Sequence, residues 1–143
     1  MFNWIKRVRK NQPPHKSRVI ELEIGGPVGR FMWNHGWGAM TIPWPFFSTI
    51  WYWTLDAQPT GDVDPFVRVH EWVHIAQDDS NLFFGVSWVK YAWQSIVHFP
   101  FRDLFKIGVT QASMEAYFGN KYEAAAYAVE DLAEQNGLPD WAK

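Results

Sequence analysis

Residues 70–74 read His-Glu-Trp-Val-His, an HExxH pentapeptide whose residue types and spacing suit a metal site. On a helix, positions i and i+4 lie about 40° apart on one face, so His70 and His74 could bind one metal ion together. Glu71 would then lie beside a water molecule at that ion, where a carboxylate can act as general base. The pentapeptide therefore predicts a metal centre with Glu71 as its base.

The residues around the pentapeptide predict a helix over 65–79 that carries it. Asp62 or Asp64 can serve as its N-cap and Pro65 as its first residue, and no Gly or Pro follows until Gly85. At about 100° per residue, the polar side chains form one strip beside an apolar stripe, which indicates a largely buried helix. Buried imidazoles and carboxylates are costly unless they are paired or bound to metal. This pattern favours a metal site over a solvated surface.

A catalytic zinc usually has three protein ligands and an open position for water, so a third ligand is needed. After His74 the chain has no further histidine until His98. We expect the third ligand from the segment 121–136. Asn120 as N-cap, an alanine-rich composition and Gly137 as the C-terminal stop predict that this segment is a helix.

Three glutamates of the 121–136 helix share one face at helical periodicity: Glu123, Glu130 and Glu134. Such a face is usually a solvated acidic surface, and we expect this of at least two of them. Glu123 is the first choice as ligand because it lies in the first turn and is followed by small alanines, which permit close approach to the HExxH helix. Glu130 is the second choice and Glu115 the third.

The two motifs together resemble the signature of the gluzincin metallopeptidases, in which HExxH is followed at a distance by ExxA. The motifs here are HEWVH at 70–74 and EAAA at 123–126. Tyr127 extends the second motif to the ExxAY of compact bacterial and phage-borne members, the minigluzincins, and Gln77 matches the HExxHxxQ found in many of them. The resemblance covers residues 65–136, and the chain has no room for the separate specificity subdomain of larger members.

The resemblance implies one Zn²⁺ ion held by His70, His74 and Glu123, with Glu71 as the base that activates water to hydrolyse a peptide or protein substrate. Because an imidazole binds metal only when neutral, we expect the metal to be released below about pH 6. The oxyanion requires one further donor. We take Tyr127 as that catalytic donor, and residue type alone leaves three others open, Tyr117, Tyr122 and Arg102.

A second interpretation keeps the same ligands but assigns no catalysis. Ten Trp and eleven Phe are more than a small core needs, and exposed aromatic surface marks a partner, a membrane interface or a polymer. A zinc-stabilised structural or adaptor protein could dock through such a surface onto a larger assembly, such as a phage virion. We favour the enzyme because a purely structural site needs no base at Glu71. A membrane-bound peptidase is a third and less favoured alternative.

The remaining elements predict an α+β fold. Strands are expected at 17–24, 38–42 and 47–53, and Gly25-Gly26-Pro27 is expected to form a turn. A small antiparallel N-terminal sheet would pack on the 65–79 helix, with further helices at about 82–98 and 121–136. By the resemblance, either of the last two strands could bind substrate backbone as an added strand.

Composition indicates a single zincin-like domain over residues 17–143, preceded by a basic, partly disordered arm over 1–16. The net charge of −2 does not indicate the basic surface that binds nucleic acid. The absence of cysteine excludes disulfides and thiolate metal sites.

Two segments bear on the location of the protein. The N-terminus has no apolar region of a signal peptide. In the apolar segment 82–99, Lys90 would cost about 3 kcal/mol in a bilayer, so a buried or interfacial helix is favoured. We expect a cytoplasmic or virion-associated protein for which membrane contact is possible but not favoured.

Overall fold

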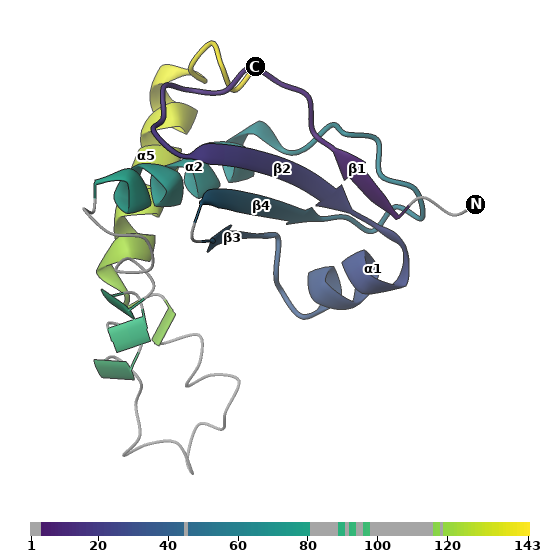
Figure 1. The fold of residues 1–143 in the computed structure, drawn as a ribbon, viewed down its shortest axis with the longest axis horizontal. Coiled ribbons are helices and arrows are strands. Elements are labelled where there is room, and N and C mark those ends of the chain that lie inside the picture. The colour runs from purple at the N-terminus through teal and green to yellow at the C-terminus, as the bar shows by residue number, and fades with distance from the viewer. Residues whose placement is uncertain are drawn as a thin grey trace.

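The structure, a computed structural model, has the expected α+β architecture. It describes residues 4–44, 46–80, 89–90, 92–93, 96–97, 116–117 and 119–143. Four strands form one sheet in the order β1-β2-β4-β3, and helices pack beside it (Figure 1). The strands are β1 (Ile5–Arg7), β2 (Arg18–Ile24), β3 (Ala39–Pro43) and β4 (Phe47–Trp53).

The pairing at the centre of the sheet differs from the antiparallel arrangement that we expected. β1 pairs with β2 and β3 pairs with β4 in antiparallel fashion, but β2 and β4 are parallel over their full lengths. Parallel strands need a crossover connection, and α1 (Gly26–Asn34) with β3 forms it. The sheet is therefore mostly antiparallel, as expected, with one parallel pair at its centre.

The helix α1 begins where we expected only a turn. Gly26 has a φ of 63°, which turns the chain sharply after β2, and Pro27 lies in the first helical turn, where its missing N–H costs nothing. A side chain at Gly29 would collide with the carbonyl oxygen of Ile24, so glycine also permits the helix to pass close to the end of β2. The glycines and proline that mark turns thus begin a helix here.

Part of the N-terminal segment is ordered. Residues 5–7 lie within the range 1–16 expected to form a partly disordered arm, and they pair with β2 as an edge strand. Their side chains are nevertheless exposed.

The two helices that carry the motifs have the predicted bounds. Asp64 caps α2 (Pro65–Asp79) by accepting hydrogen bonds from the backbone N–H groups of residues 66 and 67. Asn120 caps α5 (Lys121–Asn136) in the same way, and Gly137, with a φ of 91°, follows its end. The expected helix at 82–98 is described only at 89–90, 92–93 and 96–97, which are helical, and the rest of it lies outside the described residues.

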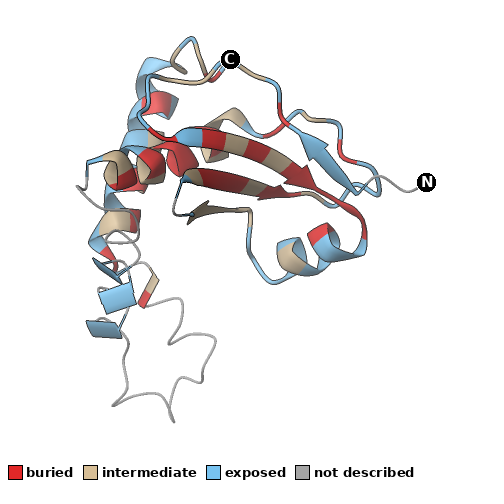
Figure 2. Ribbon diagram, viewed as in Figure 1, coloured by how far each residue is buried: buried red, intermediate tan, exposed pale blue. Residues whose placement is uncertain are grey.

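The helix α2 is fixed against the sheet by an apolar core and a buried ion pair. Trp72 and Ile75 pack with residues of β2 and β4; buried and partly buried positions alternate along most of β2, whereas most of β4 is buried (Figure 2). The Arg68 guanidinium contacts both carboxylate oxygens of Glu21, at 2.7 and 2.8 Å, and neither side chain is exposed. Arg68 also donates to the carbonyl oxygens of Asn11 and Trp141. One side chain thus joins α2, β2 and both terminal segments, and this sets the position of the HExxH helix.

Candidate metal centre

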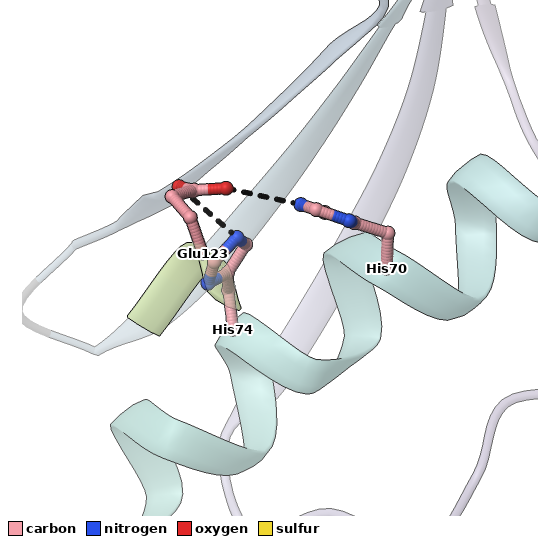
Figure 3. Close-up of side chains that lie close together, drawn as sticks. All are labelled: His70, His74 and Glu123. Carbon is pink, nitrogen blue, oxygen red and sulfur yellow. Dashed lines mark hydrogen bonds and ion pairs between the residues drawn. The ribbon is translucent and has the colours of Figure 1, made fainter. Parts of the chain in front are cut away.

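Three potential metal-ligating side chains, from two helices, meet at one point. His70 and His74 lie one turn apart on α2, and Glu123 lies in the first turn of α5 (Figure 3). The Nε2 atom of His70 is 3.1 Å from Oε2 of Glu123, and the Nε2 atom of His74 is 3.4 Å from Oε1 of the same carboxylate. One ligand atom from each residue lies within 4.8 Å of the others. These are the three residues chosen from the sequence, and together they could hold a metal ion.

The close approach of the two helices depends on small side chains. Ala126 of α5 is fully buried, and Ala133 packs with Val69 of α2. Gln77 of α2 adds a polar link, because its amide nitrogen donates to the backbone oxygen of Tyr122, 3.0 Å away. Of the alanines that directly follow Glu123, Ala126 therefore has the role that we expected, whereas Ala124 and Ala125 are exposed.

Each histidine has a partner on the ring nitrogen that faces away from Glu123. Nδ1 of His70 is 3.0 Å from Oε2 of Glu130, and Nδ1 of His74 is 2.9 Å from Oε1 of Gln77. Because both partners are acceptors, each Nδ1 can carry a hydrogen, which leaves Nε2 able to bind a metal ion in place of the proton that it shares with Glu123. This is the tautomer in which an imidazole can bind a metal through Nε2.

Glu130 does not occupy the ligand position that we considered for it from the sequence. If Glu130 were the third ligand, its carboxylate would face the same Nε2 atoms of His70 and His74 that Glu123 faces. It instead contacts the outer nitrogen of His70. Glu134, on the same side of α5, is exposed, as expected for a solvated glutamate. Glu115 lies outside the described residues.

The electrostatics of the group favour a bound cation. Burial raises the pKa of Glu123, but hydrogen bonds from His70 and His74 lower it more, and the net pKa lies well below the usual range. Burial lowers the pKa of His74, but the hydrogen bond to Glu123 and the charges of Glu71 and Glu123 raise it more, so the net shift is upward. A proton on His74 is thus stabilised by the carboxylates here, and a metal ion could supply that positive charge instead.

Glu71 is buried beside this group and is held by the sheet. The hydroxyl of Thr41, in β3, donates to Oε2 of Glu71 over 2.6 Å. Burial raises the pKa of Glu71, and this outweighs the lowering by the charge of His74 and by the Thr41 hydrogen bond. A carboxylate with a raised pKa is a stronger base than an ordinary glutamate, which suits proton transfer. Thr41 had no signal in the sequence beyond its place in an expected strand.

Two tyrosines border the group. The ring of Tyr127 packs edge-on against His70, with centroids 4.5 Å apart, and Tyr117 packs against Tyr127 at 6.5 Å. Burial raises the pKa of Tyr117, and the negative charge of Glu123 and a hydrogen bond to it raise it further. Both phenols are therefore protonated and able to donate.

The other two donors considered from the sequence have less support. Tyr122 provides its backbone oxygen to Gln77, and its ring contacts the ammonium group of Lys121. Arg102 lies outside the described residues.

Comparisons with known proteins do not assign the chain to a family. No protein-family model, curated protein or solved structure matches this chain. The resemblance to gluzincins therefore stays a hypothesis based on two motifs.

None of the described helices has both the length and the apolar character needed to cross a bilayer.

Proposed function

We propose that the protein is a zinc-dependent metallopeptidase in which His70, His74 and Glu123 bind one Zn²⁺ ion and Glu71 is the general base. Two imidazole nitrogens and one carboxylate oxygen are a donor set of catalytic zinc sites, and three protein ligands leave a fourth position open. The observation that supports this most directly is the convergence of both Nε2 atoms on Glu123, with the outer nitrogens held by Glu130 and Gln77.

The residues around the proposed ion have separable roles. When bound, Zn²⁺ supplies a Lewis acid and lowers the pKa of water in its open position. Glu71 accepts a proton from the attacking water and delivers it to the leaving amine. Thr41 holds the carboxylate of Glu71 in place during both transfers. Tyr127, with Tyr117 behind it, donates a hydrogen bond to the carbonyl oxygen of the scissile bond as negative charge develops there.

The sheet offers a place for the substrate backbone. β3 is the edge strand next to β4, and its Thr41 contacts α2, whereas β4 is paired on both sides. An extended peptide could therefore add to the outer edge of β3 and pass beside Glu71. Of the two strands left open by the sequence, the geometry favours β3.

The adaptor interpretation keeps a specific observation in its favour. Several large apolar side chains are exposed, among them Phe31, Phe46 and Trp93. A zinc-stabilised adaptor would use such residues to bind a larger assembly, such as a virion, and would need no turnover at Glu71.

Metal content tests both interpretations first. We expect about one zinc per chain in the purified protein, and loss of zinc in Glu123→Ala and His74→Ala but not in the matched control Glu134→Ala. A parent protein without stoichiometric zinc would contradict both the enzyme and the adaptor.

Peptide hydrolysis then separates the enzyme from the adaptor. The zinc-loaded Glu71→Gln variant should lose activity roughly 100-fold or more, because it cannot accept the proton from water. Equal rates for this variant and the parent, at equal zinc content, would end the peptidase proposal and leave the adaptor.

A further inference from the structure

The end of the molecule that carries β1 and α1 exposes aromatic and basic side chains together. On β1 and just before it, Trp4, Ile5 and Arg7 are exposed, and on α1 so are Val28, Arg30 and Phe31. We call these six residues the aromatic–basic surface. Trp4, Arg30 and Phe31 line one cavity of about 520 Å³, so the residue just before β1 and the helix α1 border the same hollow.

The apolar side chains of this surface are largely exposed. The exposed fraction is 61% for Phe31, 52% for Ile5 and 41% for Trp4. Trp33 and Trp37, at the end of α1 and just beyond it, are also about half exposed. A cluster of exposed rings marks a surface that is covered in use.

Positively charged residues are concentrated in the N-terminal part of the chain, and this indicates what kind of partner the surface could bind. Residues 4–55 contain seven lysines and arginines, and their only two carboxylates, Glu21 and Glu23, are buried. Asp56 is the first exposed carboxylate and lies at the rim, where its backbone oxygen accepts a hydrogen bond from Gly26. Within the described part of the chain, neither Arg7 nor Arg30 forms an ion pair. Arg7 and Arg30 are therefore exposed cations outside any described ion pair, whereas Lys10 of the same segment pairs with Asp62.

We propose that the aromatic–basic surface binds a membrane that contains anionic phospholipids. Tryptophan and phenylalanine rings partition into the region between headgroups and acyl chains, and arginine pairs with lipid phosphates. A second copy of the chain fits less well, because it would bring the arginines of both copies together. Sequence alone favoured a solvated arm at 1–16, and the exposed rings of α1 beside β1 change that preference.

The placement of the two ends fits this proposal. α1 and the metal-binding helix α5 lie at opposite ends of the sheet (Figure 1). Binding through α1 would leave the group of His70, His74 and Glu123 uncovered by the membrane. The proposal does not depend on the nature of the metal or on catalysis.

Sedimentation of the protein with lipid vesicles tests the proposal. We expect binding to vesicles of phosphatidylcholine with about one-third phosphatidylserine, weak binding to pure phosphatidylcholine, and a loss of binding as salt is raised. Replacing Arg7 and Arg30 by Gln should lower the partition coefficient roughly tenfold, whereas Lys143→Gln should not. Equal binding to both vesicle types, or no binding to either, overturns the proposal.

The aromatic contribution needs its own pair of variants. Phe31→Ser should weaken vesicle binding, whereas Leu132→Ser, an exposed apolar position on α5, should not. If Phe31→Ser unfolds, Trp33→Ser on the same helix takes its place. Vesicle binding that both α1 variants leave unchanged overturns the proposal. Absence of vesicle binding with a dimer in sedimentation velocity would assign the surface to a second copy, and absence of both would assign it to another protein.

Discussion

Nδ1 of His70 lies 3.0 Å from Oε2 of Glu130, while Nε2 of the same ring faces Glu123. Glu130 can therefore orient the imidazole so that Nε2 faces the proposed metal position. The two glutamates lie two turns apart on α5, so one helix provides both the proposed ligand and the residue that orients another ligand.

Replacing Glu130 should weaken metal binding without abolishing it. We expect the zinc affinity of Glu130→Ala to fall about 10-fold to 100-fold, because His70 loses the partner that orients its ring. Competition with a chelating dye measures this. Glu134→Ala is the matched control, since Glu134 is exposed on the same helix. An affinity of Glu130→Ala equal to that of the control would show that the contact does not support the site.

Metal binding should depend on pH through His74. The net pKa of this histidine is raised, since the hydrogen bond to Glu123 and two nearby carboxylate charges outweigh the lowering by burial. Protons therefore compete with the metal from a higher pH than the usual value of about 6.5. Metal content measured after dialysis should fall as pH decreases through that raised value and should be lost by about pH 4. Full occupancy at pH 4 would count against the site.

The raised pKa of His74 predicts that the stability of the metal-free protein falls as pH rises, whereas metal binding increases. A histidine whose folded pKa is raised stabilises the fold below its unfolded pKa of about 6.5, and this stabilisation is lost as pH rises through the folded pKa. In thermal unfolding with excess chelator, the contribution of His74 to stability should therefore decrease above neutral pH. With zinc bound, stability should instead increase with pH. Comparison with His74→Gln isolates the contribution.

Breaking the buried ion pair should be the most destabilising of these changes. Arg68→Met removes four hydrogen bonds and leaves Glu21 buried without its cation, so we expect a loss of about 3–5 kcal/mol in the free energy of unfolding. Denaturant unfolding measures it. The double variant with Glu21→Leu should recover part of the loss, because no isolated charge then remains. A single variant as stable as the parent would show that the pair is not needed.

Thr41 should affect the rate of the proposed reaction more than substrate binding. Its hydroxyl holds Oε2 of Glu71, so Thr41→Val should lower kcat roughly 10-fold to 100-fold with little change in KM. Thr41→Ser keeps the hydroxyl and should restore most of the rate. If zinc content is normal and the serine variant is as slow as the valine variant, the hydrogen bond is not what positions the base.

Much of the fold followed from local patterns in the sequence. The caps Asp64 and Asn120 and the apolar periodicity predicted the bounds of α2 and α5, and alternation predicted β2, β3 and β4. Glycine and proline were ambiguous, because the residues that usually mark a turn also begin a helix such as α1. The parallel pairing of β2 with β4 has no local signature, since it depends on the path of the chain between them.

The HExxH spacing by itself determined that His70 and His74 share one helix face and that Glu71 follows the first of them. Only the tertiary structure decided which glutamate joins them. Glu123 and Glu130 lie 53 and 60 residues beyond His70 and occupy the same face of one helix, so periodicity could not rank them. The contact from Thr41 spans 30 residues and two elements. Such contacts are set by how α2, α5 and β3 pack together, which no short segment of the chain encodes.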